Sequence, residues 1–271
     1  MSTFHALSRL QMQRESVICL HSSGASGRQW DALAAPLSAQ FEVITPDLLG
    51  YGGRAAWPIG TPASLTEEAQ ALAPLLDGRP GGVHLVGHSF GGTVALQMAL
   101  RWPSRVKSLT LFEPVRFAVL FGNPETAEAG EAIVGMGRRI GLTVLSGRLA
   151  AAAAIFVDYW SGEGAWEAMS PGRQAALAAR MPKVHAEFET LFADRVPLAA
   201  YSRLTMPVRL IRGDRSPAPA RLVVGRLGRQ LPNVDVVTLR GVGHMGPVTH
   251  PAEFAKALPA WLQPAVHELA A

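Results

Sequence analysis

The chain has 271 residues, of which 48% are hydrophobic and 17% charged, and its net charge is +4. This composition is typical of a globular protein with a sizeable buried core, and it excludes a disordered or fibrous chain. The basic residues are spread singly along the sequence without a dense block, so we expect no nucleic-acid partner.

Features that the sequence lacks further limit the class of protein. Cys19 is the only cysteine, which excludes an intrachain disulfide and a cysteine metal cluster. No apolar run approaches the roughly 20 residues that a membrane helix needs, and residues 1–16 lack the pattern of a secretory signal. We therefore expect a cytoplasmic protein with no membrane association. No motif indicates a cofactor or a metal, and the sequence leaves the oligomeric state open.

Short apolar runs alternate with helical patterns along most of the chain. Strands are predicted over residues 17–20, 41–45, 83–86, 106–112, 208–212 and 234–239, and helices over residues 27–39, 65–76, 91–101, 220–231 and 251–262. This alternation predicts an α/β fold with a mostly parallel central sheet and helices on both faces. Few residues precede the first strand, so we expect at most one regular strand before it.

The alternation stops between about residues 115 and 205, where the pattern is helical throughout. We expect a helical lid there, inserted after the strand that ends at Glu113, within a single domain that spans residues 1–271. The segment carries several large aromatic residues. They either line an apolar pocket or pack the lid onto the sheet, and we favour packing for most of them: Phe121, Phe156, Trp160 and Trp166.

Residues 87–91 read Gly-His-Ser-Phe-Gly, which matches the G-x-S-x-G pattern of a nucleophilic serine. The motif directly follows one predicted strand and directly precedes a predicted helix. A tight turn in this position holds Ser89 in a strained conformation and aims its hydroxyl at the helix N-terminus, where the helix dipole favours negative charge. Ser89 is therefore the candidate nucleophile.

A serine hydroxyl needs a general base at neutral pH, and His244 is the best candidate among eight histidines. It lies in a glycine-rich loop after the last predicted strand, at the same sheet edge as Ser89. His88 is next to the nucleophile but should point the other way, and His21 is better explained as a structural hydrogen-bonding residue.

Four motifs in this order resemble the α/β-hydrolase superfamily, in its serine-nucleophile branch. Besides the serine motif, they are residues 21–24 (His-Ser-Ser-Gly), 46–53 (Pro-Asp-Leu-Leu-Gly-Tyr-Gly-Gly) and 241–245 (Gly-Val-Gly-His-Met). The resemblance covers nearly the whole chain. It implies that residues 21–24 form an oxyanion loop, and that the backbone N–H groups of Ser23 and Phe90 stabilise a developing negative charge.

The acid that orients His244 departs from the usual pattern of the superfamily, because Ser216 stands at the expected position. Glu113 and Asp214 are the two candidates to replace it, and we favour Glu113. Its strand should lie between those of Ser89 and Asp214, and Pro114 should keep Glu113 extended at the sheet edge.

These residues predict a serine hydrolase that cleaves a small-molecule carboxylic ester or related acyl bond through an acyl-serine intermediate. The substrate should carry an apolar group. Related hydrolases cleave carbon–carbon bonds with the same triad, and that activity is the alternative within enzymes; a cofactor-free perhydrolase or haloperoxidase activity is a weaker one. A slow-turnover ligand-binding or regulatory protein is the alternative of another class, since the usual acid is missing.

Overall fold

The computed structural model describes residues 14–79 and 81–262. The expectation about a strand near the start of the chain concerns residues that lie largely outside this part. Six strands form one sheet in the order β2-β1-β3-β4-β5-β6, and every neighbouring pair is parallel. Their bounds are β1 (Ser16–Leu20), β2 (Glu42–Ile44), β3 (Val83–His88), β4 (Val106–Phe112), β5 (Val208–Gly213) and β6 (Val234–Leu239). The predicted parallel sheet is confirmed, with each strand within two residues of its predicted bounds.

The connecting helices are also close to the prediction but several are shorter. They are α1 (Asp31–Leu37), α2 (Leu65–Leu72), α3 (Phe90–Arg101), α8 (Ala218–Gln230), α9 (Gly246–Thr249) and α10 (Pro251–Ala257). The helix expected over residues 65–76 continues beyond α2 as a 3₁₀ turn, because Pro74 has no N–H to donate and its ring crowds the preceding turn.

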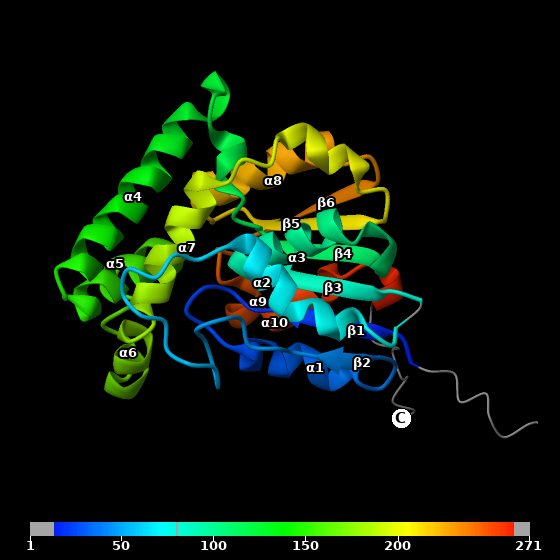
Figure 1. The fold of residues 1–271 in the computed structure, drawn as a ribbon, viewed down its shortest axis with the longest axis horizontal. Helices are drawn as coiled ribbons and strands as arrows, with labels where there is room; N and C mark the ends of the chain where they lie inside the picture. Colours follow the sequence, from blue (N-terminus) through cyan, green and yellow to red (C-terminus); the bar gives the residue numbers. More distant parts are fainter. Residues whose placement is uncertain (1–13, 80, 263–271) are drawn as a thin grey trace, which may run out of the picture.

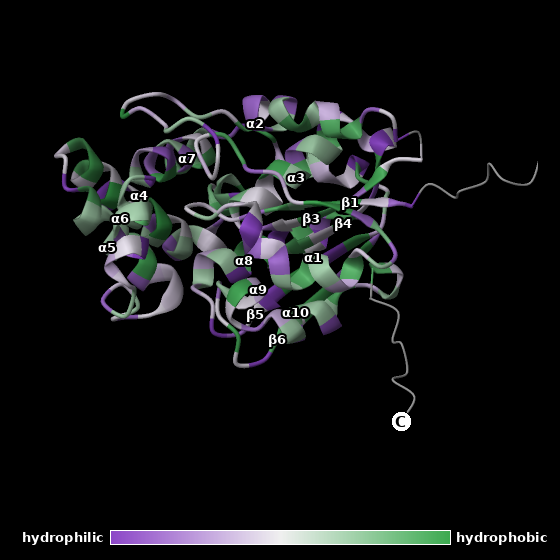
Figure 2. Cartoon of the chain, turned by 90° about the horizontal axis from the view of Figure 1, so that it is seen from below, coloured by the Kyte–Doolittle hydropathy of each residue, from purple (hydrophilic) through white to green (hydrophobic). Residues whose placement is uncertain are grey.

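Helices cover both faces of the sheet, and each face has its own apolar core. Ile18 and Leu20 of β1 join the core beneath α2, α3 and α8, whereas Val17 and Cys19 join the core beneath α1 and α10. Successive strand residues alternate between the faces, as a pleated strand requires. Figure 2 shows the resulting layers, with hydrophobic strands between helices.

Four helices are inserted between β4 and β5: α4 (Ala127–Leu145), α5 (Leu149–Ser161), α6 (Pro171–Ala178) and α7 (Met181–Ala193). In Figure 1 this helical insertion lies to the left, beyond one end of the strands. A buried ion pair ties its last helix to the sheet, since Arg116 after β4 contacts Asp194 after α7.

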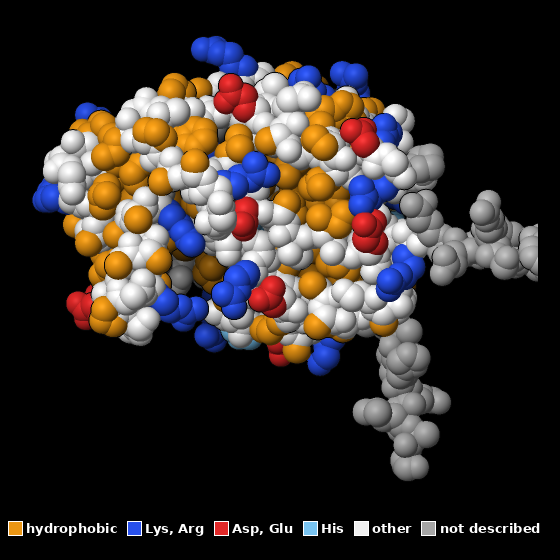
Figure 3. Space-filling view, turned by 60° about the horizontal axis from the view of Figure 1, so that its bottom comes forward, with side chains coloured by type: hydrophobic (Ala, Val, Ile, Leu, Met, Phe, Trp, Pro, Cys, Tyr) orange, Lys and Arg blue, Asp and Glu red, His pale blue; other side chains and the backbone are white. Residues whose placement is uncertain are grey.

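The surface shows no large region of one charge on the face drawn in Figure 3, where Lys and Arg side chains are scattered among neutral and acidic ones. Within the described residues, none of the helices combines the length and the apolar character that crossing a membrane requires.

Candidate active site

Ser89 stands in the sharp turn between β3 and α3, with φ 55° and ψ −119°. A positive φ is uncommon outside glycine, and here the surrounding backbone holds it in place. The Ser89 N–H donates to the carbonyl of Phe112 at 3.0 Å, which fixes the turn to the end of β4. The strand-to-helix turn expected from the sequence is therefore present, at the carboxyl edge of the sheet.

Ser89, His244 and Glu113 form one chain of hydrogen bonds. His244 Nδ1 lies 2.6 Å from Glu113 Oε2, and His244 Nε2 lies 3.0 Å from Ser89 Oγ. All three side chains are buried. Because a carboxylate only accepts, Nδ1 carries the proton, and Nε2 is left to accept from the Ser89 hydroxyl. This is the arrangement in which an imidazole can remove the hydroxyl proton.

The second carboxylate oxygen of Glu113 is also occupied, because it accepts the Gly213 N–H at 2.7 Å. The backbone of Glu113 differs from the expectation. Its φ is 44°, so the residue is not extended as predicted from Pro114. Proline disfavours a right-handed helical conformation before it, but it does not by itself impose an extended one. The positive φ turns the chain out of β4, while the carboxylate reaches Gly213 and His244.

The other two residues considered for the acid lie elsewhere. Asp214 is exposed and accepts the Gly241 N–H at 2.7 Å. Ser216 is buried, and its hydroxyl makes no hydrogen bond to the described residues. Of the two carboxylates named from the sequence, Glu113 is the one in contact with His244.

The loop after β1 lies against Ser89, and its backbone is held on several sides. His21 Nδ1 donates to the Ser22 carbonyl at 2.8 Å, and His21 Nε2 accepts the Leu48 N–H at 3.0 Å. Burial lowers the pKa of His21 to about 4, so this ring is neutral at neutral pH. Arg180, from the helical insertion, donates to the Gly24 carbonyl at 2.6 Å.

The two residues predicted to supply backbone donors, Ser23 and Phe90, both lie close to Ser89 in the structure. Phe90 is the first residue of α3, directly after Ser89, and Ser23 lines the same cavity as Ser89 and His244. The Ser22 N–H is already used, since it donates to Gln29 Oε1 at 3.0 Å.

A cavity of about 170 Å³ opens over Ser89 and His244. The helical insertion supplies most of its apolar wall: Phe156, Val157, Trp160, Met169 and Leu177. Trp160 lies directly against the imidazole, with ring centroids 4.1 Å apart. Of the four aromatic residues singled out in the sequence, Phe156 and Trp160 line this cavity. Phe121 packs on Phe192 instead, and Trp166 packs against the core.

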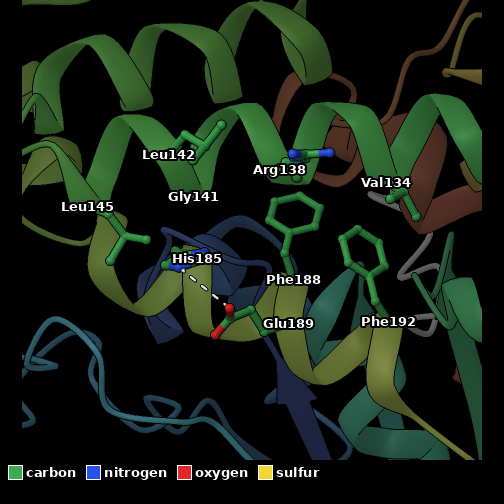
Figure 4. Close-up of a pocket in the computed structure, with 10 residues that line it drawn as sticks. Val134, Arg138, Gly141, Leu142, Leu145, His185, Phe188, Glu189 and Phe192 are labelled. Atoms are coloured by element: carbon green, nitrogen blue, oxygen red, sulfur yellow. Dashed lines mark ion pairs between the residues drawn. The ribbon is translucent and has the colours of Figure 1, made fainter.

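A second depression of about 280 Å³ lies between α4 and α7 on the outside of the insertion. Figure 4 shows Phe188 and Phe192 pointing from α7 toward α4. Phe188 also meets the ring of Phe156 edge to face, with centroids 6.5 Å apart. Phe188 lines the outer depression and Phe156 lines the cavity over Ser89, so the rings of Phe188 and Phe156 lie between the two.

A buried cluster of charged side chains lies next to the ring of Phe90. Lys183 Nζ in α7 lies 2.6 Å from Glu68 Oε1 in α2 and 4.0 Å from Glu187 Oε1. The same Nζ is 5.7 Å from the centroid of the Phe90 ring. Burial raises the pKa of Glu187 to about 7 and raises the pKa of Glu68 as well. The cluster joins the insertion to α2 next to the start of α3.

One residue next to this site could not be singled out from the sequence. Gln29 lies between the loop after β1 and His88, with its Nε2 3.2 Å from His88 Nδ1. Nothing in the motifs indicates a glutamine at this position. Within the part of the chain that the structure describes, no cluster of His, Cys, Asp and Glu side chains is arranged to hold a metal ion.

Comparison with known proteins agrees with this architecture. The family model described as "Alpha/beta hydrolase family" matches residues 17–257. The chain therefore belongs to the alpha/beta hydrolase family.

Individual relatives either match most of the chain at low identity or match only part of it at higher identity. A pimeloyl-[acyl-carrier protein] methyl ester esterase from Aromatoleum aromaticum is 29% identical over 90% of this chain and 96% of its own length. The lipase LipV of Mycobacterium tuberculosis is 40% identical, over 36% of each chain. The chain covers only about a third of the length of several such relatives. An esterase structure from Thermogutta terrifontis shares the fold, with a TM-score of 0.71, 24% identity, and 92% and 89% of the two chains covered.

Proposed function

We propose that this protein hydrolyses small carboxylic esters through a covalent acyl intermediate on Ser89. The observation that carries the proposal is the hydrogen-bonded chain Ser89–His244–Glu113, which ends in a largely apolar cavity. A hydroxyl at the N-terminus of α3 and an imidazole nitrogen facing it are the two groups that acyl transfer requires.

In the first half of the reaction, Ser89 Oγ attacks the carbonyl carbon while its proton passes to His244 Nε2. The carbonyl oxygen becomes an oxyanion, to which the backbone N–H groups of Ser23 and Phe90 donate. His244 then gives the proton to the leaving alcohol as the carbon–oxygen bond breaks, and the acyl group remains on Ser89. Glu113 holds the imidazole in the required tautomer and stabilises its protonated form.

In the second half, a water molecule takes the place of the alcohol. His244 removes its proton, the hydroxide attacks the acyl carbon, and the bond to Ser89 breaks with the proton returned to Oγ. The carboxylic acid is then released. The same imidazole therefore acts twice as base and twice as acid.

The lining and the volume of the cavity favour a neutral substrate of modest size. No Lys, Arg, Asp or Glu is among its lining residues, and burying an unpaired charge there is costly. Its volume is below the roughly 300 Å³ at which sites for drug-sized ligands begin. We therefore expect p-nitrophenyl esters of short acyl chains to be cleaved faster than those of long chains.

Labelling with a fluorophosphonate probe tests the proposal, with the modified residue mapped by mass spectrometry and Ser89→Ala as the control. Rapid labelling confined to Ser89, together with turnover of p-nitrophenyl acetate, is the expected result. A folded protein that neither labels nor turns over would favour a binding protein of the same fold.

A further inference from the structure

A second chain of hydrogen bonds passes behind the candidate active site. Gln29 Oε1 accepts from Ser22 twice, from its N–H at 3.0 Å and from its hydroxyl at 2.8 Å. Gln29 Nε2 lies 3.2 Å from His88 Nδ1, and His88 Nε2 lies 2.8 Å from the carbonyl oxygen of His244. Three segments that are far apart in sequence are thus joined through two side chains.

The direction of each bond in this chain follows from the His244 carbonyl and from the neutral state of the His88 ring. The His244 carbonyl can only accept, so His88 Nε2 must carry a proton. Burial, with His244 nearby, keeps the pKa of His88 well below its usual value, so the ring is neutral and Nδ1 is an acceptor. Gln29 must then present its N–H₂ group to His88, which leaves its oxygen facing the two donors of Ser22. All of these groups are satisfied in a single arrangement.

The two ends of the chain are the two segments whose placement the reaction requires. Ser22 directly precedes Ser23, the proposed oxyanion donor in the loop after β1. The His244 carbonyl belongs to the residue whose imidazole faces Ser89. His88 is fully buried, with its ring edge to face with Phe112 at a centroid distance of 5.5 Å, so it has little freedom to move. The His88 ring also lies beside the His244 imidazole, with ring centroids 5.1 Å apart. Neither Gln29 nor His88 lines the cavity over Ser89.

We propose that Gln29 and His88 are positioning residues that hold the oxyanion loop and the His244 loop in register with each other. This rests on the proposed function, because it concerns the geometry of the same acyl transfer. A displacement of about 1 Å between reacting groups can lower a rate about a hundredfold, so a link between the donor loop and the base has a direct kinetic consequence.

Three variants separate the parts of the link. Gln29→Met keeps the size of the side chain but removes both contacts. Gln29→Glu keeps an acceptor for Ser22 but offers no donor to His88 Nδ1. His88→Phe keeps a ring against Phe112 and removes the bond to the His244 carbonyl. Gln97→Met is the matched control, because Gln97 is a partly buried glutamine that accepts hydrogen bonds from Arg116 away from this site.

The measured quantities are kcat and KM for p-nitrophenyl acetate, with kcat expressed per active site titrated by the fluorophosphonate, and the melting temperature. We expect Gln29→Met and His88→Phe to lower kcat per titrated site by about tenfold to a hundredfold, from the misplacement argument above. KM should stay within about twofold, since neither side chain lines the cavity over Ser89. Gln29→Glu places a carboxylate beside His88 Nδ1, which favours a doubly protonated ring that keeps both bonds, so its kcat should stay closer to the wild type than that of Gln29→Met. His88→Phe serves as the test should Gln29→Met not fold.

The double variant Gln29→Met/His88→Phe gives the sharpest readout. If the two residues act as one link, breaking it twice costs no more than breaking it once, so the double variant should be no slower than the slower single variant. Independent losses that multiply would overturn the inference. It would also be overturned if the single variants melt earlier but keep the wild-type kcat per titrated site, because both roles would then be merely structural.

The outcome for the wild type separates this inference from the function on which it rests. Folded wild-type protein that does not label at Ser89 would overturn the proposed function and the positioning role together. Wild-type protein that labels and turns over, with Gln29→Met and His88→Phe as fast as Gln97→Met, would overturn the positioning role alone.

Discussion

Replacing Glu113 by glutamine tests the hydrogen-bonded chain at its most constrained point. One oxygen of Glu113 accepts the Gly213 N–H at 2.7 Å, and the other accepts from His244 Nδ1 at 2.6 Å. The Gly213 N–H is a backbone donor that cannot reverse, so the side-chain amide of the Glu113→Gln variant must turn its oxygen toward it. The N–H₂ group of that amide then faces His244, which forces the proton from Nδ1 to Nε2. An imidazole in that tautomer cannot accept the Ser89 proton.

The expected loss follows from that tautomer and from the lost negative charge. An amide in place of a triad carboxylate lowers kcat by about 10⁴ in a serine protease, which corresponds to about 5 kcal/mol of barrier. We expect a similar fall here for p-nitrophenyl acetate hydrolysis, and a parallel fall in the rate of fluorophosphonate labelling. The overall shape of the side chain is unchanged, so the far-ultraviolet circular dichroism spectrum should be that of the wild type.

Asp214→Asn is the matched control, because Asp214 is exposed and accepts the Gly241 N–H rather than contacting His244. Its kcat should stay within a few-fold of the wild type. A Glu113→Gln protein that retains a tenth or more of the wild-type kcat would contradict the role of Glu113, and so would a larger loss in Asp214→Asn than in Glu113→Gln.

Three further outcomes concern stability. In Gly91→Ala, the new Cβ would lie 2.3 Å from the Leu20 carbonyl oxygen, so we expect a loss of about 3 kcal/mol or failure to fold, measured by urea denaturation. Lys183→Met leaves the carboxyl groups of Glu68 and Glu187 buried without their cation, and should lower the free energy of unfolding by about 3–5 kcal/mol in the same assay. Burial lowers the pKa of His21 from 6.5 to about 4, so between these values the unfolded chain binds a proton that the folded chain excludes. The stabilisation that depends on a neutral His21 is therefore complete above pH 6.5, and the free energy of unfolding falls by about 1.4 kcal/mol per pH unit as the pH drops from 6.5 toward 4. The difference in free energy of unfolding between the wild type and His21→Gln, measured by urea denaturation, should shrink over this range.

The succession of strands along the chain and the turn that carries Ser89 were predictable because both depend on short local patterns. Apolar runs predicted all six strands, and the glycine-flanked serine placed Ser89 in its turn. The backbone of Glu113 was not predictable in the same way. The rule for residues before proline describes local sterics, whereas its φ of 44° accompanies contacts with Gly213 and His244, which are 100 and 131 residues away.

The role of Gln29 depends even more on tertiary structure. Its partner His88 is 59 residues away, and the next partner, the carbonyl of His244, is a further 156 residues away. A solvated or buried glutamine in a short 3₁₀ turn carries no periodic signal. The catalytic roles of individual residues are predictions that the experiments above test, and the single-domain organisation of residues 1–271 stays a prediction.

The position of Glu113, the candidate acid, directly after β4 makes physical sense once the path of the His244 loop is considered. Ser89 follows β3, Glu113 follows the neighbouring β4, and the loop with His244 returns from β6, so it must cross the end of β5. It crosses directly over Gly213, where a Cβ would lie 2.0 Å from the Val242 carbonyl oxygen. Only a residue without a side chain allows that approach. The Gly213 N–H is the donor that Glu113 accepts, so the same glycine both admits the histidine loop and holds the carboxylate that contacts His244. A carboxylate at position 216, after β5, is therefore not required for this geometry. Glu113, after β4, reaches His244 from the side of β5 that faces away from β6.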